Sequence, residues 1–253
     1  MAAISPQLLD TIHELQKIPS FENSALGGGT NLAIRYAHRK STDIDVFFQE
    51  TIGKAGFKEI EKDVQDFYGT KLFGLQYPCD IDDQFMFLRF FVVKDSETIK
   101  VEVMQNMAML DGYEIYEDIR MVSEQDIALF KLMSASNRAS QKDIYDLDYL
   151  TEKFDLVALH QALAEKQELF SDPKFQNIFD QDNEVSPVAN PLLLLKFDEG
   201  RSAVSDKRPS HSQNRIEVME GAKNWISARS SWRSKVRKLF NHLGVDFPSV
   251  ISQ

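Results

Sequence analysis

Hydrophobic residues recur along the chain with two spacings, one typical of helices and one of strands. After Ser5 and Pro6, leucine and isoleucine return every three to four residues, so we expect Ser5 to cap a helix that begins with Pro6. Over 98–104, apolar residues alternate with Lys100 and Glu102, which is the period of a strand. The same reasoning predicts helices at 6–18, 31–37, 50–67, 123–136, 141–153, 156–170 and 222–243, and strands at 44–48, 73–77, 84–93 and 98–104.

The ends of these segments contain residues that usually start or connect elements. Ser123 is a predicted N-cap, and Asp126 stands at the capping-box position three residues later. The polar residues 94–97 form the turn of a predicted hairpin, and 171–191, rich in Asp, Asn, Pro and Gln, is a predicted loop or linker. We expect the apolar residues of the last helix to pack on the body, with stacking on bases as the alternative for its two tryptophans: Trp225, Ile226, Trp232, Val236 and Leu239.

A glycine-rich turn and two carboxylates precede and begin the strand predicted at 44–48. Because alternate residues of a strand project to the same side, Asp43 and Asp45 should point into one site. Two close carboxylates repel each other unless a cation lies between them, and hard oxygen ligands suit Mg²⁺. The backbone N–H groups of Gly27–Thr30 could approach phosphate oxygens at a helix N-terminus. A tight connection between a strand and a helix explains the same glycines equally well.

Glu102 is a carboxylate within an otherwise apolar strand. It shares one strand face with Lys100 and Met104. It is either a third acid of the same metal site or a solvent-facing strand residue, and the alternation alone favours the second interpretation.

Composition limits the class of protein. Hydrophobic residues make up 43% and charged residues 27% of the 253 positions, as in ordinary globular proteins. No apolar run approaches the roughly 20 residues of a membrane span, and the first residues lack the pattern of a signal peptide. A single cysteine, Cys79, leaves no internal disulfide and no zinc pattern. We therefore expect a cytoplasmic protein with no membrane partner.

Charge is distributed unevenly along the chain. The net charge of −10 by itself argues against a nucleic-acid partner. From Arg201 onward, however, ten Lys and Arg residues stand against four Asp and Glu residues, a net of +6, so residues 1–200 carry −16. Such a basic segment can attract a polyanion such as RNA, or it can pair with the acidic body of the same chain. Charge alone leaves both interpretations open.

These features together resemble the AbiEii/AbiGii toxin family of nucleotidyltransferases, within the DNA polymerase β-like superfamily. The resemblance covers about 26–150 and rests on three motifs in order: a small glycine turn before Asp-x-Asp, an acid on a later strand, and a helix lysine followed by a charged run. In this chain the motif residues are Gly28, Gly29, Thr30, Asp43, Asp45, Glu102, Lys131, Arg138, Lys142, Asp143 and Asp146. Two of them depart from the family pattern, since the third acid is more often Asp and Lys142 stands where Arg is usual.

The resemblance implies an α+β fold, with a nucleotidyltransferase core (a mixed β-sheet flanked by helices) followed by a mainly α-helical C-terminal region. We expect the core at 1–120 and the helical domain at 121–253, the latter contributing Lys131 and Asp143 to the site and ending in the basic helix.

The resemblance also implies roles for the motif residues. Asp43, Asp45 and Glu102 would hold Mg²⁺, or alternatively Mn²⁺, against a nucleoside triphosphate (NTP). Lys131 would neutralise phosphate charge, and Asp143 and Asp146 would orient Lys131 or the acceptor. The residues expected to bind the nucleotide are Gly28, Gly29, Thr30, Ser41 and Lys131.

The favoured function is transfer of a nucleoside monophosphate to an acceptor hydroxyl, with RNA, tRNA in particular, as the acceptor. The protein would act as a toxin of a toxin–antitoxin or phage-defence system, with a cognate antitoxin as a candidate partner. The alternatives are nucleotidyl transfer to a small molecule, such as an antibiotic, or to a protein, and an inactive protein that binds a nucleotide or a partner. Structural explanations also remain for the charged residues: Lys131 as a packed helix lysine, 138–146 as surface ion pairs, and His38 and Arg39 as solvated side chains.

Overall fold

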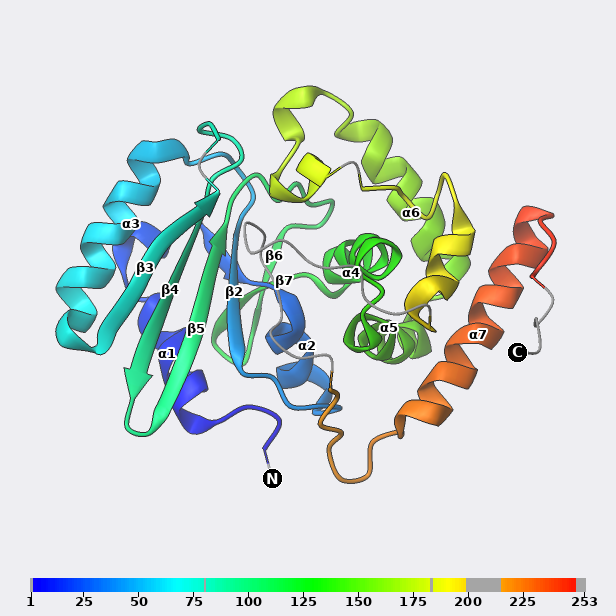
Figure 1. Cartoon of the computed structure of the whole chain (residues 1–253), viewed down its shortest axis with the longest axis horizontal. Helices are drawn as coiled ribbons and strands as arrows, with labels where there is room; N and C mark the ends of the chain where they lie inside the picture. Colours follow the sequence, from blue (N-terminus) through cyan, green and yellow to red (C-terminus); the bar gives the residue numbers. More distant parts are fainter. Residues whose placement is uncertain (1, 80, 183, 199–214, 249–253) are drawn as a thin grey trace.

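A seven-stranded mixed sheet forms one half of the molecule, and a group of helices forms the other (Figure 1). The computed structural model describes residues 2–79, 81–182, 184–198 and 215–248. The strand order is β3-β4-β5-β2-β1-β7-β6, with β2 parallel to β5, β1 parallel to β7 and the other neighbours antiparallel. The strands are β1 Ser24–Leu26, β2 Asp43–Phe48, β3 Leu72–Cys79, β4 Phe87–Lys94, β5 Glu97–Met104, β6 Tyr113–Tyr116 and β7 Ile119–Val122.

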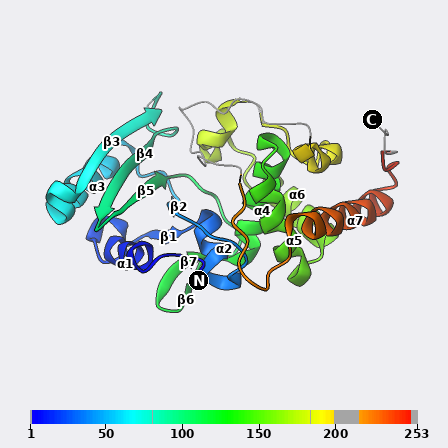
Figure 2. The ribbon, with the colours of Figure 1, turned by 60° about the horizontal axis from the view of Figure 1, so that its bottom comes forward.

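Helices cover both faces of this sheet. Figures 1 and 2 show α1 and α3 against one face, while α4 to α7 gather beyond the other, with α2 between the sheet and that group. The helices are α1 Pro6–Leu15, α2 Gly28–Tyr36, α3 Gly53–Tyr68, α4 Glu124–Arg138, α5 Gln141–Lys153, α6 Leu156–Leu169 and α7 Trp225–Leu243. Short 3₁₀ turns lie at Pro19–Phe21, Gly69–Lys71, Pro173–Phe175, Ile178–Asp182 and Pro191–Asp198. This arrangement confirms the expected α+β fold, with a helical region after the sheet.

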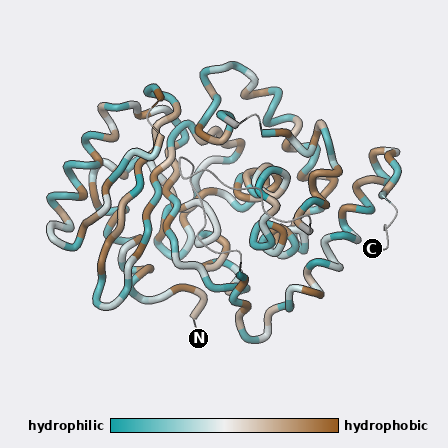
Figure 3. Tube along the Cα trace, in the orientation of Figure 1, coloured by the Kyte–Doolittle hydropathy of each residue, from teal (hydrophilic) through white to brown (hydrophobic). Residues whose placement is uncertain are grey.

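Alternation along the central strands separates two hydrophobic cores. In β2, Ile44, Val46 and Phe48 pack with α1 and α3, whereas Phe47 packs with the helices on the other side. The intervening Asp43 and Asp45 therefore share the face of Phe47, as the period of two predicted. Figure 3 shows brown and teal alternating along the outer helices, as expected for helices that pack through one face.

The short strands β1, β6 and β7 were not predicted from the sequence. Each has three or four residues, which is too short to show a period, and β1 pairs with β7 across nearly a hundred positions of the chain. Some predicted boundaries also move: α2 begins at Gly28 rather than at position 31, α3 begins at Gly53, and β4 begins at Phe87 rather than at position 84.

The capping box predicted at the start of α4 forms only in part. The hydroxyl of Ser123 accepts the N–H of Asp126 at 3.1 Å, as expected of an N-cap. The Asp126 carboxylate, however, accepts the backbone N–H groups of 110–112 at 2.8–3.1 Å, and the N–H of Ser123 donates to Gly112. The Asp126 carboxylate therefore binds three N–H groups of the turn that packs on the helix, in place of the single Ser123 N–H that a complete capping box would offer it.

The last helix packs on the body through part of its predicted apolar face. Trp232 is fully buried, and its indole N–H donates to the carbonyl of Leu194, so its assignment to the core is confirmed. Ile226 is 78% exposed, so that part of the prediction is wrong; it lies in the first turn, ahead of the part of α7 that packs. No helix in the part of the chain that the structure describes is long and apolar enough to span a membrane.

Candidate active site

Charged side chains of β2 and β5 lie next to one another on the sheet face that carries Phe47. The parallel pairing of the two strands sets Asp45 opposite Glu102 and Asp43 opposite Lys100. Asp45 is 6% exposed and Glu102 only 1% exposed. The interpretation of Glu102 as a solvent-facing residue is therefore wrong, because the helical half of the molecule lies over this side of the strand.

Two cations compensate the charge of Glu102. Arg89 Nη2 lies 2.6 Å from Glu102 Oε1, and Lys100 Nζ lies 3.1 Å from Glu102 Oε2. Burial raises the pKa of the Glu102 carboxyl, although Lys100 and Arg89 act in the opposite direction. The Lys100 ammonium also lies 3.5 Å from Asp43 Oδ2. Burial alone would lower the pKa of Lys100, but the carboxylates around it outweigh burial and raise it, so this ammonium is charged.

The carboxylates are suited to a divalent cation, but they do not already surround one position. Among the described residues, no three His, Cys, Asp or Glu side chains form a group that could hold a metal ion. Asp45 is nearly buried, makes no salt bridge with a described residue and lines a cavity. A buried carboxylate without a cation is costly, and its hard oxygens suit Mg²⁺ or Mn²⁺. Asp45 therefore fits such an ion, whereas Asp43, on the same strand face, is paired with Lys100 and is not among the residues that line this cavity. Glu102 lies opposite Asp45, and both of its oxygens already meet a cation, Arg89 or Lys100.

The glycine turn lies directly against these residues. Gly28 has φ +60°, and a Cβ added there would be 1.8 Å from Asp45 Oδ2. A Cβ at Gly29 would be 2.3 Å from an Arg39 Nη2 atom. The N–H of Gly27 donates to the Asp45 carbonyl at 2.7 Å. The glycines thus permit the N-terminus of α2, whose first N–H groups have no acceptor within the helix, to lie beside the Asp45 carboxylate.

Thr30 and Ser41 lie at the same end of β2. Thr30 is 1% exposed, and its hydroxyl bonds Ser41 Oγ at 2.8 Å and the Asp43 carbonyl. These contacts hold the start of β2 against α2. A phosphate contact by either hydroxyl stays a prediction.

Lys131 reaches the centre of the molecule from α4 and meets two carboxylates of α5. Its Nζ lies 2.7 Å from Asp143 Oδ1 and 2.8 Å from Asp146 Oδ2, and both aspartates are fully buried. Burial alone would lower the pKa of Lys131, but Asp143 and Asp146 raise it. The proximity expected between the helix lysine and the two aspartates is present. Arg138 lies 3.2 Å from Asp143, so 138–146 forms buried ion pairs rather than surface pairs.

His38 and Arg39 belong to this network, which corrects their description as solvated side chains. Arg39 is 3% exposed and holds both Asp146 oxygens, with Nε–Oδ1 2.6 Å and Nη2–Oδ2 2.7 Å. His38 is fully buried, and its Nε2 lies 2.7 Å from Asp146 Oδ1. Burial raises the pKa of Asp146, but Arg39 and Lys131 outweigh it and hold the pKa well below its usual range. Asp146 therefore connects the segment before β2 to α4 and α5.

Sequence reasoning missed several cations that pair with the predicted site residues. Arg89 is the one charge among the phenylalanines of its strand, and it pairs with Glu102 in the β4–β5 register. That isolated charge on a strand neighbouring Glu102 was a signal that could have found it. No local pattern distinguishes Arg39, because its partner is 107 positions away.

A cavity of about 180 Å³ opens beside these groups, between the sheet and the helical half. Gly28, Asp45, Glu102, Lys131 and Arg138 line one part of it. The rest is mainly apolar, and the segment predicted as a loop at 171–191 supplies part of that wall. Residues from all three sequence motifs thus border one space.

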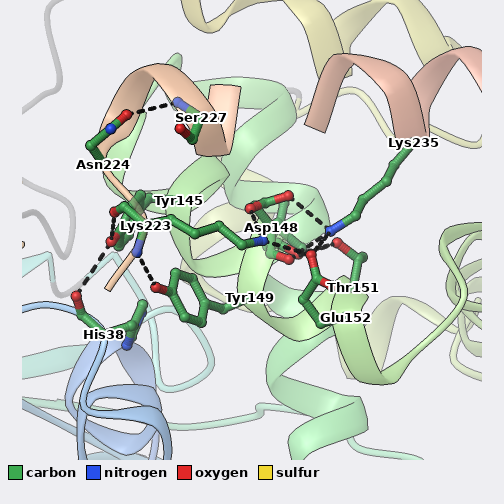
Figure 4. Close-up of polar contacts among 11 residues, drawn as sticks. His38, Tyr145, Asp148, Tyr149, Thr151, Glu152, Lys223, Asn224, Ser227 and Lys235 are labelled. Atoms are coloured by element: carbon green, nitrogen blue, oxygen red, sulfur yellow. Dashed lines mark hydrogen bonds and ion pairs between the residues drawn. The ribbon is translucent and has the colours of Figure 1, made fainter. Parts of the chain in front are cut away.

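The basic C-terminal segment pairs partly with the acidic body. Figure 4 shows Lys223 and Lys235 converging on Asp148 and Glu152 of α5. Both lysines lie within 2.8 Å of an oxygen of Asp148, which is fully buried. For these two lysines the intramolecular interpretation is confirmed. The part of the basic segment at 201–214 lies outside the described residues.

A family model described as "Nucleotidyl transferase AbiEii toxin, Type IV TA system" matches residues 12–211. The chain belongs to this AbiEii family. The matched residues include the whole sheet and helices α2 to α6, whereas α7 lies beyond them.

This AbiEii chain is also similar, at low sequence identity, to individual proteins. An uncharacterized protein of Aquifex aeolicus is 29% identical over 143 residues, which are 56% of this chain and 65% of that protein, so the match spans less than two thirds of the relative. The nucleotidyltransferase toxin MenT4 of Mycobacterium tuberculosis has 17% identity and a TM-score of 0.50, over 95% of this chain and 83% of that one. The crystal structure of JHP933 from Helicobacter pylori has 17% identity and a TM-score of 0.46, over 95% of this chain and 97% of that one. The likeness to MenT4 supports the assignment of the fold.

Proposed function

We propose that this AbiEii-family protein is a metal-dependent nucleotidyltransferase that moves a nucleoside monophosphate from an NTP to an acceptor hydroxyl. The observation that carries the proposal is that Gly28, Asp45 and Lys131, which are separated by up to 103 positions, border one cavity. A helix N-terminus, a carboxylate suited to a cation and a buried ammonium are together what a triphosphate requires.

The proposed reaction is a substitution at the α-phosphorus. The acceptor oxygen forms a bond to that phosphorus, and the bond from phosphorus to the oxygen that bridges to the β-phosphate breaks. The electron pair of the broken bond leaves with pyrophosphate. The proton of the acceptor hydroxyl passes to a carboxylate of the site, for which Asp45 and Glu102 are the candidates.

Each group has a separate task in this proposal. Asp43 and Asp45 would hold Mg²⁺ or Mn²⁺, with Glu102 as the third ligand; the ion supplies charge stabilisation to the phosphates. Lys131, kept charged and held in place by Asp143 and Asp146, would neutralise a phosphate oxygen.

RNA, and tRNA in particular, is the acceptor that we propose. The basic residues of α7 other than Lys235 would contact the RNA backbone. The family description as a type IV toxin supports a cognate antitoxin as a further partner and a toxic outcome of the transfer.

A transfer assay with the full chain tests the proposal. Each of the four α-³²P-labelled NTPs is incubated with total cellular RNA and Mg²⁺, with the wild type and with Asp45→Asn. Asp66→Asn, a change at an exposed position of α3 on the opposite side of the sheet, is the matched control. We expect label on a defined RNA band with the wild type and Asp66→Asn, and none with Asp45→Asn.

Two results would count against the proposal in different ways. Label on a small molecule or a protein instead of RNA would replace the acceptor and keep the transfer chemistry. Absence of transfer to any of these acceptors, or full transfer by Asp45→Asn, would overturn the assignment of the site.

A further inference from the structure

The apolar part of the cavity lies next to the residues proposed to bind the triphosphate. Its walls come from β2, β5, α4, α6 and the residues 175–180, and their apolar side chains are mainly phenylalanine and methionine. The aromatic residues are Phe47, Phe130, Phe170, Phe175 and Phe179. An apolar cavity of about 150 Å³ in another protein accommodates a benzene ring, so this cavity of about 180 Å³ can take one six-membered ring.

Lys166 of α6 places a buried cation in this apolar wall. The residue is 9% exposed, and among the described residues its Nζ has no hydrogen-bond acceptor. The Nζ lies 3.8 Å from the centroid of the Phe130 ring. The nearest carboxylate oxygen, Asp126 Oδ1, is 3.8 Å away, beyond hydrogen-bonding distance.

The Asp126 carboxylate does not need Lys166 as a partner. It already accepts three backbone N–H groups of 110–112 and the hydroxyl of Ser123. Burial lowers the pKa of Lys166 to about 8, which shows how incompletely Asp126 compensates the ammonium. A buried donor without an acceptor is costly, so a ligand that brings an acceptor oxygen into the cavity would relieve that cost.

The position of the cavity identifies the kind of ligand. Asp45, Gly28 and Lys131 border the same space, so a molecule that holds its phosphates there extends its other end toward Phe130 and Lys166. That end must be a flat ring with an acceptor oxygen on its edge. Cytosine and uracil are single six-membered rings with a carbonyl oxygen, whereas adenine has two rings and no carbonyl, and guanine has a carbonyl but two rings.

We infer that the cavity receives the base of a pyrimidine NTP and that Lys166 donates a hydrogen bond to a ring carbonyl of that base. This inference rests on the proposed function, because the phosphate groups set the direction of the ligand. Lys166 would accordingly recognise the carbonyl that cytosine and uracil share, while the size of the cavity would disfavour the two-ring purines.

Binding of five ligands to the full-length protein tests the inference. The dissociation constants of CTP, UTP, ATP, GTP and inorganic tripolyphosphate are measured by calorimetry in the presence of Mg²⁺. The variant is Lys166→Met, which keeps most of the length of the side chain and removes the donor. Lys58→Met, at a lysine 68% exposed on α3, is the matched control.

For the wild type and Lys58→Met we expect CTP and UTP to bind at least about tenfold more tightly than ATP and GTP, the size expected for a hydrogen bond to a charged donor. Lys166→Met should lose about tenfold in affinity for the pyrimidine nucleotides and keep the wild-type affinity for tripolyphosphate. Retained tripolyphosphate binding also shows that the variant is folded.

The inference is overturned where purine nucleotides bind as tightly as pyrimidine nucleotides, or where Lys166→Met keeps the wild-type affinity for CTP and UTP. In either case, binding of tripolyphosphate and transfer of nucleotides would leave the proposed function standing. Failure of all five ligands to bind the wild type would overturn both the inference and the proposed function.

Discussion

The close approach of Gly28 to Asp45 allows a test that separates two effects of a substitution: strain in the backbone and displacement of the Asp45 carboxylate. A Cβ at position 28 would lie 1.8 Å from Asp45 Oδ2, 2.6 Å from its Cγ and 2.9 Å from its Cβ. Rotation of the carboxylate alone does not relieve the collision, because the Asp45 Cβ is itself too close. In Gly28→Ala either the strand or the start of α2 must therefore move.

The expected magnitude follows from these distances. Real Cβ atoms essentially never come within 3.0 Å of another heavy atom. The carboxylate oxygen must therefore retreat by about 1 Å, and a misplacement of that size can cost about 100-fold in rate. The positive φ adds about 1–2 kcal/mol of backbone strain. We expect Gly28→Ala to fold, to be destabilised by at least that amount and to lose about 100-fold in kcat/KM.

Gly244→Ala is the matched control. Gly244 has φ +66°, similar to Gly28, but a Cβ there meets nothing within 4 Å. It should therefore lose about 1–2 kcal/mol of stability and keep its transfer activity. Urea denaturation gives the free energies of unfolding, and the labelled-nucleotide assay gives the rates at a temperature where both variants are folded. Equal transfer rates for the two variants would refute the argument that Gly28 makes room for Asp45.

Two further predictions concern charge networks. Lys131→Met leaves two buried carboxylates of α5 without one of their cations, so it should lower the free energy of unfolding at pH 7 by about 3–5 kcal/mol. Lys58→Met, the exposed control, should change that free energy by less than about 0.5 kcal/mol. Equal urea midpoints for the two variants would contradict this prediction. Hydrogen bonds from Lys223 and Lys235 lower the pKa of Glu152 from 4.5 to about 2. The ionised Glu152 carboxylate therefore stabilises the folded state above pH 4.5, and this contribution is lost as the pH falls toward 2. Urea unfolding of the wild type should lose more stability over that interval than unfolding of Glu152→Gln, and parallel pH profiles would exclude this role for the Glu152 carboxylate.

Local pattern was sufficient for most of the larger elements. The helical period predicted α1, α5, α6 and α7 to within a few residues, and the period of two in β5 placed Lys100 and Glu102 on one face. The strand β1 could not be predicted, because three residues show no period and its partners come from distant segments. Most of the architecture, but not the full strand order, was therefore accessible from the sequence.

The motif residues of the site were identified through their resemblance to a family, whereas their partners were not. The cations Arg39, Arg89 and Lys166 appear in no motif. Arg39 pairs with Asp146 across 107 positions, and Arg89 pairs with Glu102 across the β4–β5 register. Lys166 became a candidate only because the structure places it in an apolar wall without an acceptor.

The sequence by itself determined which side chains share a face of each strand or helix, because that depends only on the periods 2 and 3.6 of the backbone. It thereby set Asp43 and Asp45 side by side and Lys131 on a packed helix. Only the tertiary structure decided that Glu102 is buried, that Arg39 and Lys131 share Asp146, and that Lys166 faces the cavity. The physical reason is that burial and charge compensation depend on which distant segments the fold brings within a few ångströms, and local periodicity contains no information about those distances.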